Sequence, residues 1–271
     1  MTERAKPYVG VSGVDTPEVQ QQLIELFDTS GLRTKRELML GMKALHKGQW
    51  LDLPGRRGPG WDVTGEAFRG CVDSNEQSVN VAQAYFDIDR VSDEVYRNAF
   101  LHRIFDRGSA WINGIQFDSY PWHEDEVFMQ FLEQTKEQYP DALIYLQCHQ
   151  WSMDAYSPKE MAQRLGEYAH AIDYLLFDAS HGKGITLDTE RLVPFIDEIY
   201  ASDRLGRVGV ALAGGLCAET VSDYLPSVVE RYPDISWDAE GKLHPKREDG
   251  TMPLDLTTVG RYFAASKEVI G

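Results

Sequence analysis

The sequence predicts an α/β chain folded as a single-domain (β/α)8 TIM barrel. Short apolar runs alternate with longer amphipathic stretches along nearly all of its 271 residues. The runs are apolar on both faces, as expected for a parallel sheet that helices cover. Eight such runs can be counted, and eight β/α units close naturally into a barrel. An open, doubly wound sheet is the alternative topology.

The first unit shows the pattern. The run YVGVSGV, 8–14, predicts a strand, and in the next stretch, 17–27, Val19, Leu23 and Phe27 fall on one helical face. The further predicted strands are 36–45, 82–88, 111–120, 141–148, 173–179, 207–215 and 234–239. The further predicted helices are 92–108, 124–140, 157–171, 188–201, 218–233 and 254–270.

One insertion interrupts the alternation. Residues 46–79, between the second and third predicted strands, are rich in Gly, Pro and Trp and show no helical or strand periodicity. A loop of this length in a compact domain is usually functional or disordered. We therefore treat 1–271 as one barrel with a 46–79 insertion that acts as a lid or as a subunit contact, which leaves a homodimer open.

Charge and cysteine content limit the partners. The chain carries 43 acidic and 27 basic side chains, a net charge of -16, which disfavours nucleic acid and anionic membranes. Its three cysteines show no C-x-x-C spacing, so no disulfide framework or structural zinc is expected. The N-terminus lacks a signal-peptide pattern, and no run reaches the roughly 18 apolar residues of a membrane span. These features predict a cytoplasmic protein with a small-molecule substrate and no cofactor.

In such a barrel the active site lies at the C-terminal ends of the strands. The candidates at these positions are Ser12, Lys43, Asp87, Asp118, His149, Asp178, Gly214, Gly215 and Asp238. An Asp that ends a strand often only caps the following helix or starts a turn.

Asp178 is the best supported of these candidates. Apolar residues precede it in LLFDASHGKGITLD, 175–188, so loss of solvation is expected to raise its pKa into the range of a general acid. Gly182, Lys183 and Gly184 follow, where backbone N–H groups and one ammonium group suit an anion.

Two later loops also carry glycine. Gly214 and Gly215 precede a predicted helix after the seventh strand, and Gly241 and Lys242 follow the eighth strand. Glycines before a helix N-terminus allow close approach to a phosphate, and barrels often bind phosphate at the loops after strands seven and eight. The sequence therefore predicts a phosphorylated small-molecule substrate.

Four segments together resemble a known family. VSGVDTPE (11–18), LLFDASHGKGITLD (175–188), LAGGLCAETV (212–221) and the tail 236–270 are similar to phosphoribosylanthranilate isomerase, a barrel enzyme of tryptophan biosynthesis. The resemblance runs along nearly the whole barrel. Its most specific parts are G-x-G-x-T-x-D, 182–188, and AGGL, 213–216.

The resemblance implies an Amadori rearrangement, in which an acid protonates the ring oxygen of an N-linked phosphoribose and a base removes the C2 proton. Asp178 takes the position of the acid. The glycine loops after strands six, seven and eight would hold the 5′-phosphate. Arg56 or Arg57 of the insertion would stand in for the family's Arg that meets the substrate carboxylate.

The chain departs from the family at two strands. Ser12 replaces the catalytic Cys of the family's K-x-C-G pattern, and a serine hydroxyl is a weak base unless another group activates it. After the eighth strand, 237–243 reads WDAEGKL instead of the family's D-x-S-S-G-x-E. His149 and Asp87 are alternative bases if their side chains point inward.

Two other functions stay open at this stage. A metal-assisted sugar-phosphate lyase or epimerase would use Asp87, Asp118, His149 and Asp178, because carboxylates and imidazole bind divalent ions. A catalytically inactive protein that binds a phosphoribosyl ligand would explain Ser12 in place of Cys.

Overall fold

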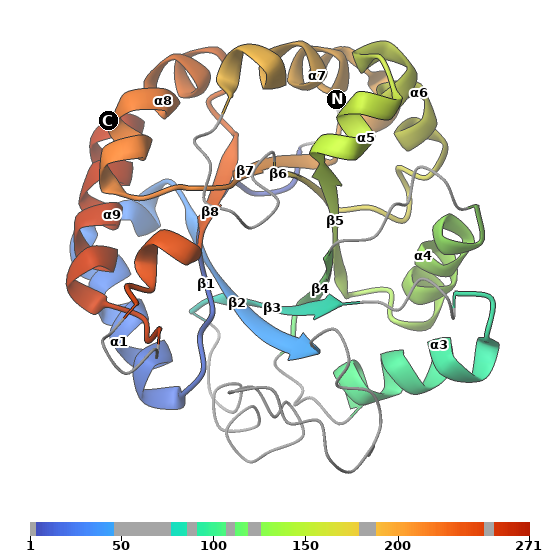
Figure 1. Cartoon of the computed structure of the whole chain (residues 1–271), viewed down its shortest axis with the longest axis horizontal. Helices are drawn as coiled ribbons and strands as arrows, with labels where there is room; N and C mark the ends of the chain where they lie inside the picture. Colours follow the sequence, from blue (N-terminus) through green and yellow to red (C-terminus); the bar gives the residue numbers. More distant parts are fainter. Residues whose placement is uncertain are drawn as a thin grey trace.

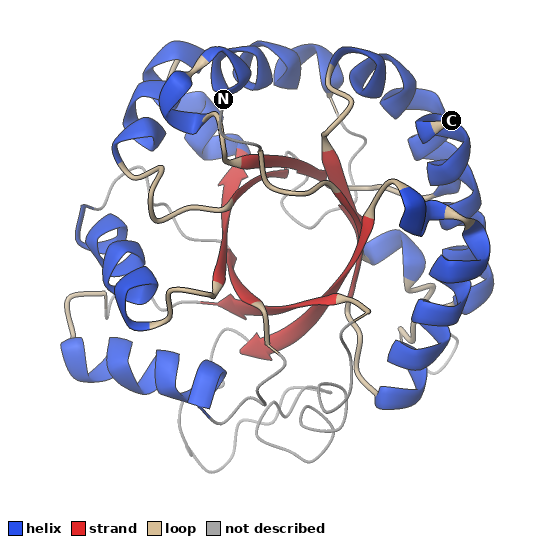
Figure 2. Cartoon of the chain, turned by 180° about the vertical axis from the view of Figure 1, so that it is seen from behind, coloured by secondary structure: helices blue, strands red, loops and turns tan. Residues whose placement is uncertain are grey.

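The computed structural model describes residues 4–45, 77–85, 91–106, 112–118, 126–178, 188–246 and 252–271. Eight parallel strands pair in chain order from β1 to β8, and β1 pairs with β8 to close the ring. Helices surround the strands, as Figures 1 and 2 show from opposite sides. The predicted (β/α)8 TIM barrel is confirmed.

The strands are β1 Tyr8–Ser12, β2 Glu37–Leu45, β3 Val79–Tyr85, β4 Gly114–Asp118, β5 Leu143–His149, β6 Tyr174–Asp178, β7 Gly209–Ala213 and β8 Ser236–Ala239. The α-helices are α1 Pro17–Ser30, α3 Glu94–Leu101, α4 Glu126–Gln138, α5 Gln150–Ala155, α6 Pro158–Glu167, α7 Thr189–Ala201, α8 Ala218–Arg231 and α9 Leu256–Ile270. Short 3-10 turns lie at η1 Leu32–Thr34, η5 Asp203–Leu205 and η6 Gly241–Leu243, and a π turn, η3 His102–Asp106, follows α3.

The third strand begins three residues earlier than the predicted 82–88, at Val79. The polar residue Asn80 hides this start in the sequence. Its buried amide oxygen accepts hydrogen bonds from Ser78 Oγ (2.9 Å) and Gln20 Nε2 (3.3 Å), so it is satisfied in the layer between β3 and α1. Val79, the last residue of the predicted 46–79 insertion, therefore belongs to β3. Residues 46–76 of the insertion lie outside the described residues.

Side chains alternate between the two faces of each strand and build two cores. The larger core lies between the barrel and the helices and includes Val9, Phe117 and Trp237. The smaller core fills the lumen, where the rings of Tyr145 and Tyr174 stack at 4.6 Å between centroids, at 7° between planes. These aromatic rings form an apolar floor below the site described next.

Helix α9 supports the pairing that closes the barrel. Tyr262 Oη donates to the carbonyl of Gly10 on β1 over 3.0 Å, and Trp237 Nε1 on β8 donates to Ser266 Oγ over 3.1 Å. Val9 and Trp237 are paired residues of β1 and β8. One helix thus binds both strands of the closure.

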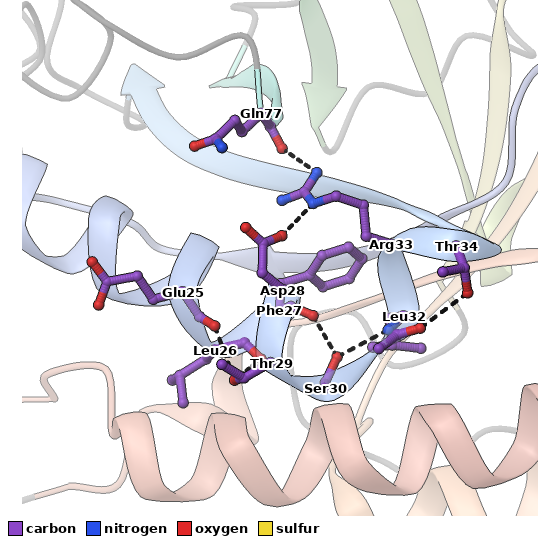
Figure 3. A network of polar contacts seen from close by, with 11 residues as sticks. Glu25, Leu26, Phe27, Asp28, Thr29, Ser30, Leu32, Arg33, Thr34 and Gln77 are labelled. Carbon is purple, nitrogen blue, oxygen red and sulfur yellow. Dashed lines mark hydrogen bonds and ion pairs between the residues drawn. The ribbon is translucent and has the colours of Figure 1, made fainter.

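Arg33 of η1 ties the end of α1 to the start of β3 (Figure 3). Its guanidinium group forms an ion pair with Asp28 and donates to the carbonyl of Gln77 over 2.7 Å. The same group lies 5.2 Å from the ring centroid of Phe27. These contacts position the chain just before β3.

Among the residues that the structure describes, none of the helices combines the length and the apolar character needed to cross a bilayer.

Candidate active site

Polar side chains replace the apolar floor in the upper lumen, toward the C-terminal ends of the strands. They share the inward face because each lies at an even spacing from a residue of the lumen core on its own strand, or pairs in register with a residue that does. They are Ser12 on β1, Gln83 on β3, Gln116 on β4, Gln147 on β5, Asp178 on β6 and Asp238 on β8, and all are buried. We call these six residues the lumen ring.

Ser12 is at the centre of a hydrogen-bond chain in the lumen ring. Gln83 Nε2 donates to Ser12 Oγ over 2.8 Å and lies 3.4 Å from Gln116 Oε1. Ser12 Oγ in turn lies 3.0 Å from Asp238 Oδ2 and 3.2 Å from Oδ1. Because an amide nitrogen only donates, the serine proton points to the carboxylate.

Two strand glycines make room for this chain. A Cβ on Gly41 would collide with Ser12 Oγ and lie 2.9 Å from Gln83 Nε2. A Cβ on Gly10 would lie 2.9 Å from the Cβ of Asp238. Glycine inside a strand often marks such a close approach, and both positions need it here.

Asp238 is an unusual carboxylic acid. Burial raises the pKa of Asp238 to about 7; the charges of Glu240 and Asp178 add to this rise, and the hydrogen bond from Ser12 opposes it. A group with such a pKa exchanges protons readily at neutral pH.

Asp178 is the last residue of β6, and its side chain is 8% exposed. Gln147 Nε2 donates to its Oδ2 over 3.1 Å. His149 is its register partner on β5, shares the inward face with Gln147, and stacks on Trp151 at 5.0 Å. The structure thus places His149 on the inward face of β5, beside the lumen ring. The sequence alone does not determine on which face of the strand His149 lies.

The turn after β7 has two residues with positive φ angles, and both are glycines. Gly214 and Gly215 have φ angles of 103° and 64°, which side chains rarely adopt. The Gly215 carbonyl accepts from Thr220 Oγ1 (3.0 Å), and Thr220 Oγ1 accepts from the backbone N–H of Cys217 (2.8 Å). The turn is therefore fixed directly before the first turn of α8.

Gly241 and Lys242 form part of η6 and are exposed. A Cβ on Gly241 would meet no atom within 4 Å, so the fold itself places no demand for glycine there.

Other expected site residues lie outside the described residues. They are Arg56 and Arg57 of the insertion, Asp87, and Gly182, Lys183 and Gly184 after β6. The side chains of Lys43 and Asp118 lie outside them as well.

The metal-dependent alternative depends on some of those residues. Within the described ranges, no three His, Cys, Asp or Glu side chains are grouped so as to hold a metal ion. Cys148 and Cys217 are free thiols.

Sequence reasoning missed half of the lumen ring. It named Ser12, Asp178 and Asp238 as strand ends but passed over the three glutamines. Their signal is a Gln within each apolar run of β3, β4 and β5, as in VAQAY, IQFD and LQCH. A second signal of the lumen ring is the presence of Gly10 and Gly41 inside predicted strands, where glycine indicates a close approach of other atoms.

Comparisons with known proteins support the fold. No protein-family model and no curated protein matches this sequence. Octameric ribulose-1,5-bisphosphate carboxylase/oxygenase from Pyrococcus horikoshii OT3, in a complex with sulfate, is similar with a TM-score of 0.53 and 14% identity over 98% of this chain and 57% of its own. A second crystal form of that enzyme is similar with a TM-score of 0.53 and 12% identity over 98% of this chain and 59% of its own.

A protein from Aquifex aeolicus VF5 is similar with a TM-score of 0.53 and 14% identity over 98% of this chain and 94% of its own. This chain spans less than two thirds of the length of the carboxylase chains. At these identities the likeness shows the barrel fold alone.

Proposed function

We propose that this chain is an isomerase of the phosphoribosylanthranilate isomerase type, which acts on a phosphoribosyl or related sugar phosphate by general acid and base catalysis. One observation carries the proposal. Two buried carboxylates, Asp178 and Asp238, lie in the lumen near the C-terminal ends of β6 and β8, and the Gly214-Gly215 turn follows the strand between them. Acid/base isomerisation needs two proton-carrying groups beside one substrate site.

In this proposal the roles of Asp178 and the Gly214-Gly215 turn rest on these positions, and the other roles rest on the family resemblance. Asp178 protonates the ring oxygen of the sugar, and Gln147 holds its carboxyl group. Backbone N–H groups at Gly214 and Gly215 face the phosphate, together with Gly182, Lys183, Gly184, Gly241 and Lys242. Arg56 or Arg57 meets a carboxylate on the substrate.

The resemblance to the family supports a reaction of tryptophan biosynthesis with a phosphorylated small molecule as the partner, and the cysteine content supports a place in the cytoplasm. The net charge of -16 makes local donors at the glycine loops necessary for an anionic substrate.

The test is turnover of phosphoribosylanthranilate by the purified chain, followed by the loss of substrate fluorescence. We expect Asp178→Asn to reduce kcat by about 10²- to 10⁴-fold with little change in substrate affinity, since it removes one proton-transfer group. Unchanged kcat in Asp178→Asn would remove the acid role.

A binding protein is the second candidate, and Ser12 favours it because this serine replaces the family's Cys. Tight binding of a phosphoribosyl ligand without turnover, combined with turnover gained in Ser12→Cys, would establish that alternative.

A further inference from the structure

The hydrogen bonds of the lumen ring differ for the two groups on β1 and β8 that could accept a proton, Ser12 and Asp238. Ser12 Oγ has one proton, which points to Asp238, and one of its lone pairs accepts from Gln83 Nε2. Gln83 Nε2 faces two oxygen acceptors, Ser12 Oγ and Gln116 Oε1, which fixes the orientation of its amide. A hydroxyl group held in this way is a poor proton acceptor.

Asp238 differs from Ser12 because its carboxylate is the final acceptor of the hydrogen-bond chain from Gln83 through Ser12. It accepts from Ser12, is 4% exposed, and lies on the inward face of β8. The groups that interact electrostatically with it are Glu240 beyond β8, Asp178 on β6, Tyr8 on β1 and Tyr262 on α9. Both tyrosines have pKa values raised above the ordinary value, first by burial, so neither supplies a negative charge at neutral pH.

The register across β6, β7 and β8 sets the two carboxylates at one level of the barrel, with one strand between them. Asp178 pairs with Ala213, and Ala211 pairs with Ser236. Continuing that register by two residues sets Ala213 opposite Asp238. The strand between the two acids therefore contributes only a methyl group at this level, and parallel strands lie about 4.8 Å apart. Asp178 and Asp238 therefore lie on strands that are two such spacings apart.

We propose that Asp238 is the catalytic base that removes the C2 proton of the substrate and that Ser12 is a positioning residue for its carboxylate. This inference rests on the proposed function and names the base that the function needs. Asp178 and Asp238 then divide the two proton transfers between β6 and β8.

The step balances with these groups alone. Once Asp178 has protonated the ring oxygen and the ring has opened to an iminium ion, the C2–H electron pair forms a C1=C2 bond. The C1=N π pair moves to nitrogen, and the proton passes to Asp238. The resulting enol becomes the ketone when C1 gains a proton and the C2 hydroxyl group loses one, so no net proton is consumed.

The experiment compares the full chain with Asp238→Asn, Ser12→Ala and Ser236→Ala in the phosphoribosylanthranilate assay across pH. Asp238→Asn should lower kcat by about 10²- to 10⁴-fold. Ser12→Ala should lower kcat by no more than about tenfold and should move the acidic limb of the pH profile upward, because the Ser12 hydrogen bond favours the charged form of Asp238. Ser236, the matched serine on the inward face of β8, contacts the backbone N–H of Tyr8, and its loss should not move the profile.

Loss of turnover in Ser12→Ala together with near-normal turnover in Asp238→Asn would overturn the inference and leave the proposed function standing. If the unmodified chain does not turn over phosphoribosylanthranilate, the proposed function fails instead.

The base assignment is then judged without substrate, by infrared titration of the full chain. A carboxyl band that titrates near pH 7, is missing in Asp238→Asn and moves to higher pH in Ser12→Ala supports the pair as a proton-transfer site for another substrate. Absence of such a band overturns it.

Discussion

Ser12 Oγ lies 3.0 Å from Asp238 Oδ2, across the pairing of β1 with β8 that closes the barrel. The two residues are 226 positions apart in the chain. Because the carboxyl group of Asp238 is buried at this closure, its ionisation affects the stability of the fold.

Asp238→Asn should stabilise the protein at alkaline pH. The pKa of Asp238 is about 7 in the folded chain, against about 3.9 for an unfolded aspartate. Between these values the folded state binds the additional proton, so the contribution of Asp238 to the free energy of unfolding falls as pH rises and reaches its lowest level above pH 7. The full difference is about 4 kcal/mol.

Urea unfolding at several pH values between 4 and 8 measures this effect. We expect the gain in Asp238→Asn to grow from near zero at pH 4 to a few kcal/mol at pH 8. A gain that is the same at every pH would contradict the raised pKa.

Gly41→Ala should disrupt the lumen ring. The added methyl group would collide with Ser12 Oγ and Gln83 Nε2, and overpacking of a buried site typically costs about 1–3 kcal/mol. Gly260→Ala in α9 is the matched control, because its Cβ would meet no atom within 4 Å and Ala is the better helix former by about 1 kcal/mol. Unfolding midpoints should therefore move in opposite directions; a Gly41→Ala midpoint at or above that of the unmodified chain would contradict the close approach.

Gly215→Ala tests the proposed phosphate loop. The positive φ angle of 64° is strained for alanine, at a cost of about 1–3 kcal/mol. We expect a lower Tm and a higher KM for a phosphorylated substrate, with a smaller change in kcat. Gly241→Ala fills open space and should leave Tm unchanged, so a raised KM there would report phosphate contact alone. An unchanged KM in Gly215→Ala would remove the loop after β7 from the binding site.

Arg33→Ala should have a small effect on global stability and a local effect on β3. The Arg33 and Asp28 side chains are 37% and 40% exposed, and such ion pairs contribute at most about 1 kcal/mol. Loss of the bond to the Gln77 carbonyl should instead increase hydrogen exchange at the start of β3. Arg33→Lys, which keeps the charge without the planar donor group, separates the two contacts. Unaltered exchange in both variants would show that Arg33 does not hold this segment.

The sequence is sufficient to predict the barrel because most strands lie within apolar runs and most helices have a clear apolar face. The predicted start of β3 was wrong because Asn80 is a buried polar residue. Its hydrogen-bond partners, Ser78 and Gln20, become visible only in three dimensions. Helix α5, Gln150–Ala155, was not predicted because six residues are too few to show a period.

The site was less accessible to prediction for a related reason. Asp178 stands out locally, since apolar residues precede it and glycines follow. The pairing of Ser12 with Asp238 depends on the closure of the ring, and the inward side of His149 depends on strand register. Neither is encoded in a short stretch of sequence.

The closure of the ring also has a consequence for the order of folding. Contacts between distant parts of a chain form slowly, because the intervening loop must first lose its entropy. During synthesis Asp178 and its partner Gln147 emerge well before Asp238, which Ser12 can meet only after β8 has joined β1. Recovery of the proposed isomerase activity in a refolding experiment would therefore report the pairing of β8 with β1, the last step of barrel assembly.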